Sequence, residues 1–425
     1  MVSELPAPSL PSDRMQPLEV NGRFYRWPKR PTAVVCFDGC DPSYLTAASA
    51  AGAIPVLDGM RRHGFSATAL AAMPTFTNPN NVSIVCGVPP AVHGVSGNFY
   101  IDRDSGREVM MVDATPMRAP TILAAFSQAG AKVAAVTAKD KLRRALGHDV
   151  KGIAFSAEKA DAAIEAENGI ADVAALIGRL APDQYSADLS LFVLDAGVRL
   201  LETQRPDLLY LSLSDYVQHK HAPEEPEAIA FMASVDARLG QLIVAGAVVG
   251  IVADHGMTDM AKPDGEPNVV YLGDALDASF GAGAMRVVCP ITDPFVRHHG
   301  ALGGFVRVHL TASDRSAEEV AAFVRALPGI AVALTCEEAC MRFDLPPDRE
   351  GDVAVVAEKG IALGARAVDH DLSQLAGTRL RSHGGLAEQS VPFILSHPLR
   401  QDAGAVPQPL HNYDIFALAL NAVEV

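Results

Sequence analysis

The stretch PTAVVCFDGCD, residues 31–41, decides the fold. Its apolar, β-branched part is typical of a buried parallel strand, and Asp38 and Gly39 end that strand with a carboxylate and a turn. The same pattern recurs, each time after a helical stretch, in AKVAAVTAKD (131–140), PDLLYLSLSD (206–215) and AVVGIVADHG (247–256). Strands that alternate with helices predict an α/β fold with a largely parallel central sheet flanked by helices.

Polar residues stand where these four predicted strands end. They are Asp38, Lys139, Asp215 and Asp254. In open α/β sheets, ligands bind beyond the carboxyl ends of the parallel strands. We therefore expect these four side chains to converge on one site.

The pattern changes at about residue 262, where the chain becomes rich in turns. RVVCPI and GGFVRVHL read as strands, and SAEEVAAFVRAL reads as a helix that Ser316 caps, with Glu319 completing a capping box. The strand VPFILS and a C-terminal helix then resume the first pattern. We predict a catalytic core of residues 1–261 and 371–425, with a smaller α+β cap of residues 262–370 inserted into it.

Composition excludes several classes of protein. The 425 residues include 50 acidic and 35 basic side chains, for a formal net charge of −15. A nucleic-acid-binding protein needs a basic face, so we expect no nucleic-acid partner. A chain of this charge weakly repels anions, so any anion site has to supply its own local positive charge.

Targeting and membrane signals are not evident in the sequence. The first 20 residues do not resemble a secretory signal, and no run reaches the roughly 20 apolar residues that span a bilayer. We expect no membrane partner and a cytoplasmic location. The six cysteines include two C-x3-C pairs, Cys36 with Cys40 and Cys336 with Cys340. A four-thiolate zinc site is one alternative, but apolar neighbours favour reduced, mostly buried thiols.

Carboxylates and imidazoles at the predicted strand ends and in the RSHGG turn form the candidate metal site: Asp38, Asp215, His219, Asp254, His255 and His383. Asp215 and His219 share a face if a helical turn follows the strand. A mixed Asp/His set suits two divalent metal ions, and zinc fits it best. Any one of these histidines taken alone more often caps a helix or fills a gap, so the prediction rests on the set.

A nucleophile for such a site is offered by MPTFTNPNNVSIVCG, residues 73–87. Its candidates are Thr75, Thr77 and Ser83, and two prolines bracket Thr77. We expect NVSIVCG to begin a helix, whose dipole favours an alkoxide at its N-terminus, and a coordinated metal favours it more strongly. The alternative is a Ser/Thr-rich helix cap without chemistry.

Six ordered motifs resemble the nucleotide pyrophosphatase/phosphodiesterase-like branch of the alkaline phosphatase superfamily: FDG (37–39), PTFTNPNN (74–81), CGVPPAVHGV (86–95), SDYVQHKHAP (214–223), ADHGM (253–257) and SHGG (382–385). The resemblance implies an alkaline-phosphatase-like core. It implies one zinc ion on Asp215, His219 and His383. It places the other on Asp38, Asp254, His255 and the nucleophile Thr77. Nucleotide-cleaving members usually carry Phe-Pro-Asn-His after the nucleophile, whereas this chain has Asn-Pro-Asn-Asn.

Three further stretches resemble the members of that branch that cleave the carbon–phosphorus bond of phosphonoacetate: GVSGNFY (94–100), TAKDKLRRALG (137–147) and CPITDPFVRHHGALGGF (289–305). The implied reaction gives acetate and phosphate through a phosphothreonine on Thr77, and Asn98 is the implied donor to a phosphonyl oxygen. Lys139 and Lys141 are placed to meet the substrate carboxylate, although a solvated basic helix start is the alternative for this stretch.

Other functions remain open in the sequence. One alternative is a metal-dependent nucleotide phosphodiesterase or pyrophosphatase, which needs an aromatic stacking slot and has no use for Lys139 or Lys141. Another is a binding protein on a degenerate phosphatase scaffold, which the complete ligand set disfavours. Roles for Arg297, His298 and His299, the choice among zinc, manganese and iron, and a homodimer are not decided by the sequence.

Overall fold

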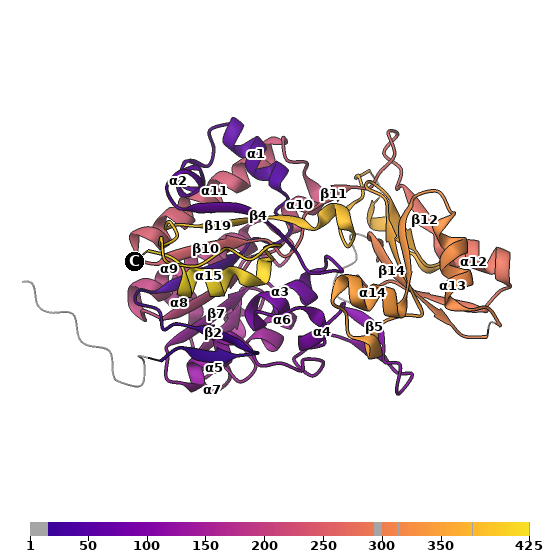
Figure 1. Ribbon diagram of the computed structural model, residues 1–425. Helices are drawn as coiled ribbons and strands as arrows, with labels where there is room; N and C mark the ends of the chain where they lie inside the picture. The colour runs from indigo at the N-terminus through magenta and orange to yellow at the C-terminus, as the bar shows by residue number, and fades with distance from the viewer. Residues whose placement is uncertain (1–15, 293–299, 313, 376, 425) are drawn as a thin grey trace, which may run out of the picture.

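The computed structural model describes residues 16–292, 300–312, 314–375 and 377–424, and it contains two main sheets (Figure 1). A seven-stranded central sheet carries helices on both faces, and a four-stranded sheet lies beside it on the right of the view. The predicted α/β class with a mostly parallel central sheet is confirmed.

The central sheet has, in spatial order, the strands β4 (Phe65–Leu70), β19 (Ser390–Leu395), β10 (Val248–Val252), β3 (Thr32–Cys36), β9 (Leu208–Ser212), β7 (Val133–Thr137) and β8 (Ile153–Ser156). Strands β10, β3, β9, β7 and β8 are parallel, and β19 and β4 close one edge in antiparallel pairings. The four strands that precede the polar ends are therefore immediate neighbours. Every residue of β3, β9 and β10 is buried, as expected for strands covered on both faces.

The helices around this sheet form two layers (Figure 1). Helix α11 (Pro226–Val244) packs against α9 (Asp188–Thr203), α1 (Pro42–Ala50) and α2 (Pro55–His63) on one side. On the other side, α15 (Ile415–Asn421) packs against β10 and against α3 (Thr77–Cys86). One large apolar cluster joins both layers to the sheet.

The second sheet has its own helices and its own core. Its strands, in spatial order, are β13 (Met285–Val288), β14 (Phe305–Leu310), β16 (Val353–Ala357) and β15 (Ile330–Thr335). Helix α13 (Ala317–Arg325) begins with the predicted capping box of Ser316 and Glu319, and α14 (Cys336–Phe343) begins with a similar one. The domain limits at residues 262 and 370 stay a prediction.

A buried arginine, held by an ion pair within the second sheet's own part of the chain, connects that sheet to the core. Arg307 on β14 and Glu350 are both fully buried, and the Arg307 Nη2 lies 2.8 Å from Glu350 Oε2. The same Nη2 donates to the Ser96 carbonyl at 2.9 Å. Arg307 therefore anchors the segment 94–100 of the core to the second sheet.

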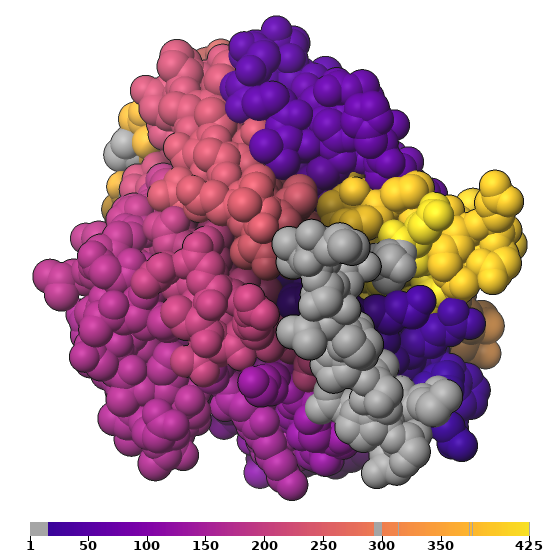
Figure 2. Space-filling model, turned by 90° about the vertical axis from the view of Figure 1, so that its left-hand side faces the viewer, coloured from indigo at the N-terminus to yellow at the C-terminus, as the bar shows by residue number. Residues whose placement is uncertain are grey.

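Distant parts of the chain build the end of the core that faces away from the second sheet (Figure 2). The indigo N-terminal segment, the magenta and pink middle segment and the yellow C-terminal segment lie side by side on this face. Strand β2 (Arg23–Tyr25) packs against α15, and Arg23 Nη1 lies 2.7 Å from Asp414 Oδ1. The N-terminal strand β2 and the C-terminal helix α15 of the described chain therefore pack against each other.

Two expectations from composition can be compared with the structure. All six cysteines are free, and four of them, including Cys36 and Cys40, are buried, as predicted. Among the described residues, the candidate metal-binding groups contain only His, Asp and Glu, so no thiolate cluster forms there.

The helices of the described segments are all too short or too polar to cross a bilayer.

Candidate active site

The predicted strand ends converge at one edge of the central sheet. Asp38 follows β3, Asp215 follows β9, and Asp254 and His255 follow β10. Gly39 makes the close approach possible, because it has a φ of +66° and an added Cβ would lie 3.0 Å from the Asp215 Cβ. The glycine after Asp38 therefore lets two neighbouring loops bring their carboxylates to the same place.

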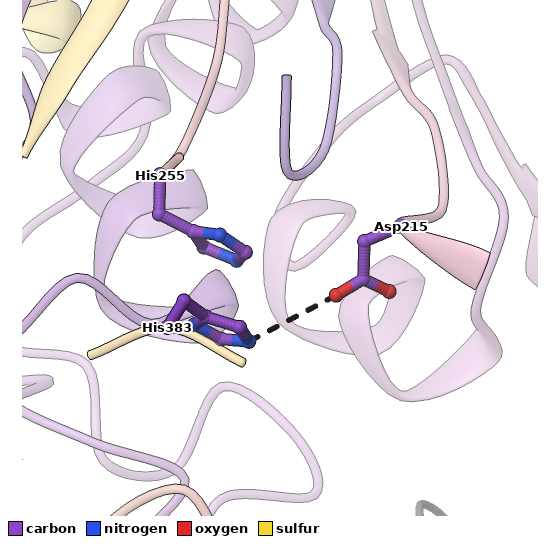
Figure 3. Close-up of side chains that lie close together, drawn as sticks. All are labelled: Asp215, His255 and His383. Atoms are coloured by element: carbon purple, nitrogen blue, oxygen red, sulfur yellow. Dashed lines mark ion pairs between the residues drawn. The ribbon is translucent and has the colours of Figure 1, made fainter. Parts of the chain in front are cut away.

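Asp215 lies beside two histidines. The His219 Nε2 is 2.8 Å from Asp215 Oδ2, and the His383 Nε2 is 3.9 Å from the same oxygen (Figure 3). The Nδ1 of His219 faces the Arg381 carbonyl at 2.7 Å, and that of His383 faces the Thr75 carbonyl at 2.8 Å. A carbonyl only accepts hydrogen bonds, so each Nδ1 carries a proton and Nε2 is the nitrogen that faces the site.

His255 joins the second group of carboxylates. Its Nε2 lies 3.3 Å from Asp38 Oδ1 and 3.7 Å from Asp254 Oδ2. Its Nδ1 faces the Gly256 carbonyl at 2.9 Å, so this imidazole also presents Nε2 to the site. The Thr77 hydroxyl is 3.2 Å from the same Nε2, which places the candidate nucleophile beside the group.

The two groups share His255. Its ring stacks on that of His383 with 3.6 Å between the ring centroids (Figure 3). Potential ligand atoms of Asp38, Asp254 and His255 lie within 4.8 Å of one another, and so do those of Asp215, His255 and His383. The resemblance assigned His255 to one ion only, whereas the geometry leaves it within reach of both positions.

Burial and neighbouring charges shift the pKa values of the carboxyl and imidazole groups of this site. It raises the pKa of Asp38 well above its ordinary value, and the nearby carboxylates of Asp215 and Asp254 raise it further. It also raises the pKa of Asp254. For Asp215, burial acts in the same direction, but His219 and His383 hold the pKa well below its ordinary value. Burial, with His255 and His219 beside it, lowers the pKa of His383 well below the ordinary value.

These residues fit divalent cations. Asp38 Oδ1 is buried and has no hydrogen-bond partner among the described residues. Three carboxylates crowd together next to the Nε2 atoms of three imidazoles, and a divalent cation between them would offset the repulsion of the buried negative charges. The donor set of carboxylate oxygen and imidazole nitrogen is one that zinc and related transition metals prefer.

Thr77 begins helix α3, which corrects the predicted helix start at Asn81. Pro79 occupies the third helical position, where the backbone N–H has no partner within the helix and its loss costs little. Every side chain of α3 after Thr77 is buried, so Thr77 is held at the positive end of a fixed helix.

Asn81 is a site residue that the sequence reasoning missed. Its Nδ2 donates to Asp254 Oδ2 at 3.1 Å and to the Thr77 carbonyl at 3.0 Å. Its Oδ1 accepts hydrogen bonds from the Tyr210 and Ser212 hydroxyls. Asn81 therefore fixes one carboxylate relative to the nucleophile, and its spacing of one helical turn from Thr77 is the signal that could have found it.

A cavity of about 730 Å³ opens in front of these residues. Asp38, Thr77, Asn98, Asp215 and His383 line it, and so do seven basic side chains: Lys139, Lys141, Arg144, Lys159, Lys220, Arg379 and Arg381. Asp140 and Glu158 also line it, so basic side chains outnumber acidic ones at this opening, in a chain with an overall net charge of −15.

Lys139 and Asn98 both line the cavity, and each is held by a hydrogen bond to a backbone carbonyl. Lys139 Nζ donates to the Gln184 carbonyl at 3.1 Å and lies 5.2 Å from the centroid of the Tyr185 ring. The Asn98 Nδ2 donates to the Ile291 carbonyl at 3.1 Å. The residues Arg297, His298 and His299 lie outside the described part of the chain.

Sheet and site together define a metal-dependent hydrolase with the alkaline-phosphatase-like fold. A family model described as Type I phosphodiesterase / nucleotide pyrophosphatase matches residues 32–384, a range that includes every candidate site residue. The chain belongs to this family.

Two crystal structures of phosphonoacetate hydrolase from Sinorhizobium meliloti 1021 are similar to the chain over nearly its whole length. Both are 47% identical and cover 96% of this chain and 98% of theirs; the TM-score is 0.91 for the complex with phosphonoformate and 0.90 for that with phosphonoacetate. Phosphonoacetate hydrolase from Penicillium oxalicum is 60% identical over 37 residues, which are 8% of this chain and about half (51%) of that relative. The predicted resemblance to the phosphonoacetate hydrolases is confirmed, and the chain is a hydrolase.

More distant structures share the fold alone. Murine ectonucleotide pyrophosphatase / phosphodiesterase 5, in complex with AMP, is 18% identical, covers 93% of this chain and 96% of its own, and has a TM-score of 0.61. This likeness supports the alkaline-phosphatase-like architecture and says nothing of the substrate.

Proposed function

We propose that the chain hydrolyses the carbon–phosphorus bond of phosphonoacetate to acetate and phosphate. The observation that carries this proposal is the 47% identity, over 96% of the chain, to a phosphonoacetate hydrolase whose crystal structure holds phosphonoacetate. The basic wall of the cavity supports it, because a small, multiply charged anion needs such an environment within an acidic protein.

The metal ions of this proposal are two zinc ions. One would be held by Asp215, His219 and His383, and the other by Asp38, Asp254, His255 and the Thr77 hydroxyl. Ions bound there would neutralise phosphonyl charge and lower the pKa of a coordinated hydroxyl or water. The carbonyl partners of the three Nδ1 atoms support this assignment, because they keep each imidazole in the tautomer that a metal requires.

In the proposed reaction, Thr77 attacks phosphorus. A bond forms between the Thr77 oxygen and phosphorus while the phosphorus–carbon bond breaks, which leaves a phosphothreonine and the carbanion of acetate. Asn98 donates to a phosphonyl oxygen. Water protonates the carbanion carbon, and the hydroxide that remains takes up the proton that the Thr77 hydroxyl lost. A second water then hydrolyses the phosphothreonine to release phosphate and restore the Thr77 hydroxyl.

The leaving group is the difficult part of this reaction. A carbanion next to a carboxylate delocalises into an enediolate, and positive charge at that carboxylate stabilises it. Lys139 and Lys141 follow β7 and line the cavity, which suits them to this role. The contacts of Lys139 with Gln184 and Tyr185 hold its ammonium group at the cavity wall.

Cleavage of two substrate classes tests the proposed function. We expect the purified chain, loaded with zinc, to release phosphate from phosphonoacetate at a rate at least about 100-fold above the rate at which it releases nucleoside monophosphate from a nucleotide diester, because a diester offers no carboxylate to the two lysines. Efficient cleavage of the nucleotide diester, with no phosphate from phosphonoacetate, would instead favour the phosphodiesterase alternative.

Lys139→Ala and Lys141→Ala are expected to weaken phosphonoacetate cleavage selectively. Loss of one preorganised charge at a developing anion typically lowers kcat by about 100- to 1000-fold. The release of p-nitrophenol from p-nitrophenyl phosphate should fall by less than about tenfold, since that leaving group stabilises its own charge. Steady-state kinetics on both substrates provides the comparison.

Lys151→Ala is the matched control for this experiment. Lys151 is exposed and is not among the residues that line the cavity. Its removal should change neither activity substantially. Equal losses on both substrates in the Lys139 and Lys141 variants would contradict the carboxylate role.

A further inference from the structure

Asn78 is a buried residue of the cavity that the reaction above does not use. It follows Thr77 in helix α3, lines the cavity and is only 2% exposed. Its side-chain Nδ2 is buried and has no hydrogen-bond partner in the described part of the chain. Buried amide groups nearly always find a partner, so this vacant donor points to an acceptor on a ligand of the cavity.

The neighbouring asparagines show that the vacancy is particular to Asn78. Asn80 donates from Nδ2 to the Ala72 carbonyl at 2.9 Å, and Asn81 donates to Thr77 and Asp254. Asn98 already donates one Nδ2 hydrogen to the Ile291 carbonyl. Asn78 therefore has more donor capacity left for a ligand than Asn98, to which the family likeness gave the donor role.

The place of Asn78 limits which part of a ligand it can meet. It is the second residue of α3, directly after the nucleophile, and the helix end carries partial positive charge. Pro79 has no N–H to offer at the next position. A phosphorus atom that Thr77 attacks has to lie at this helix end, so its oxygens are the acceptors closest to the Asn78 amide.

We propose that Asn78 is a specificity residue that donates from Nδ2 to an unsubstituted, charged oxygen on phosphorus. This inference rests on the proposed function, because it assumes attack by Thr77 on a phosphonyl or phosphoryl group. A phosphonate or monoester has three unsubstituted oxygens on phosphorus, whereas a diester has two and carries an alkylated oxygen, with less charge and more bulk, in the third position, which the proposal places at Asn78. Asn78 thus favours phosphonates and monoesters over diesters.

The test compares three substrates in Asn78→Ala and Asn78→Asp. Removal of a hydrogen bond to a charged oxygen is expected to lower kcat/KM for phosphonoacetate and p-nitrophenyl phosphate by about 10- to 100-fold. The diester bis-p-nitrophenyl phosphate should lose less than about threefold, because it makes no such bond. Asn78→Asp keeps the size of the side chain but replaces the donor by an acceptor, so its loss on phosphonoacetate and p-nitrophenyl phosphate should be larger still.

Equilibrium binding of inorganic phosphate gives a readout apart from turnover. Calorimetry with the zinc-loaded enzyme should show binding to Asn78→Ala that is about 10-fold weaker than to the wild type. Val112→Ala is the matched control, because Val112 lines the same cavity and has no side-chain donor. Circular dichroism verifies folding, and if the alanine variant does not fold, the equally sized aspartate variant decides.

The outcomes separate this inference from the proposed function. Unchanged kinetics and phosphate binding in both variants, or equal losses on all three substrates, would overturn the role of Asn78. A wild-type enzyme that releases no phosphate from phosphonoacetate would overturn the proposed function. In that case the ratio of monoester to diester activity still decides on Asn78.

Discussion

Thr77→Ala is expected to abolish phosphonoacetate turnover, with a fall in kcat of about 10⁴-fold or more, because no other group takes the place of a lost nucleophile. The Thr77 hydroxyl lies 3.2 Å from His255 Nε2 at the first position of a buried helix. The readouts are phosphate release and the metal content per chain. Inductively coupled plasma mass spectrometry measures the metal content. The metal content should stay near two ions per chain, since three other residues of that group remain.

Thr77→Ser is the matched control for this prediction. A serine keeps the hydroxyl and loses only a methyl group, so part of the activity should return. In the wild type, acid quenching within one turnover should trap phosphate on Thr77, which peptide mass spectrometry detects. Substantial turnover by the alanine variant, or phosphate trapped on another residue, would rule out Thr77 as the nucleophile.

Removal of divalent metal is expected to reduce activity by about 10³-fold or more, and zinc should restore it. The reason is the buried set of carboxylates: burial raises the pKa of Asp38 and Asp254, and both carboxylates need positive charge nearby to stay ionised. Dialysis against a chelator, followed by activity and metal titration, measures this dependence. Full activity of metal-free protein would contradict it.

Variants can show which residues hold the metal. Asp38→Asn and His383→Ala should each lower the bound metal, because each removes a candidate ligand from a different group. His148→Ala is the matched control. Its side chain is exposed, it belongs to none of the candidate metal-binding groups of the described residues, and it does not line the cavity. If this control lost as much metal as the other two variants, the assignment would be wrong.

Sequence alone predicted the sheet and the convergence of its polar ends because both depend on local patterns. Short buried runs that end in Asp or Lys identify parallel strands, and the shared direction of those strands brings their ends to one edge. The same reasoning indicated Asp38, Lys139, Asp215 and Asp254, and the RSHGG turn indicated His383. The family likeness added Asn98, which no strand pattern could place.

Other parts of the site depend on contacts that no local pattern encodes. The start of α3 was predicted too late, at Asn81, whereas the packed helix tolerates Pro79 in its first turn. Asn81 was not predicted as a site residue, because its partners Tyr210 and Ser212 lie far along the chain. Charged residues such as Arg307 and Glu350 are usually exposed, so their full burial could not be expected from sequence.

The tie between Arg307 and the Ser96 carbonyl has a consequence for protein engineering. Asn98 stands two residues from Ser96, and its backbone N–H and side-chain amide bond to Pro290 and Ile291 near β13. A chimera that received the second sheet of a nucleotide-cleaving relative would therefore lose the alignment of Asn98 together with the sheet. A functional chimera has to exchange residues 94–100 together with the second sheet and the residues that bond to them.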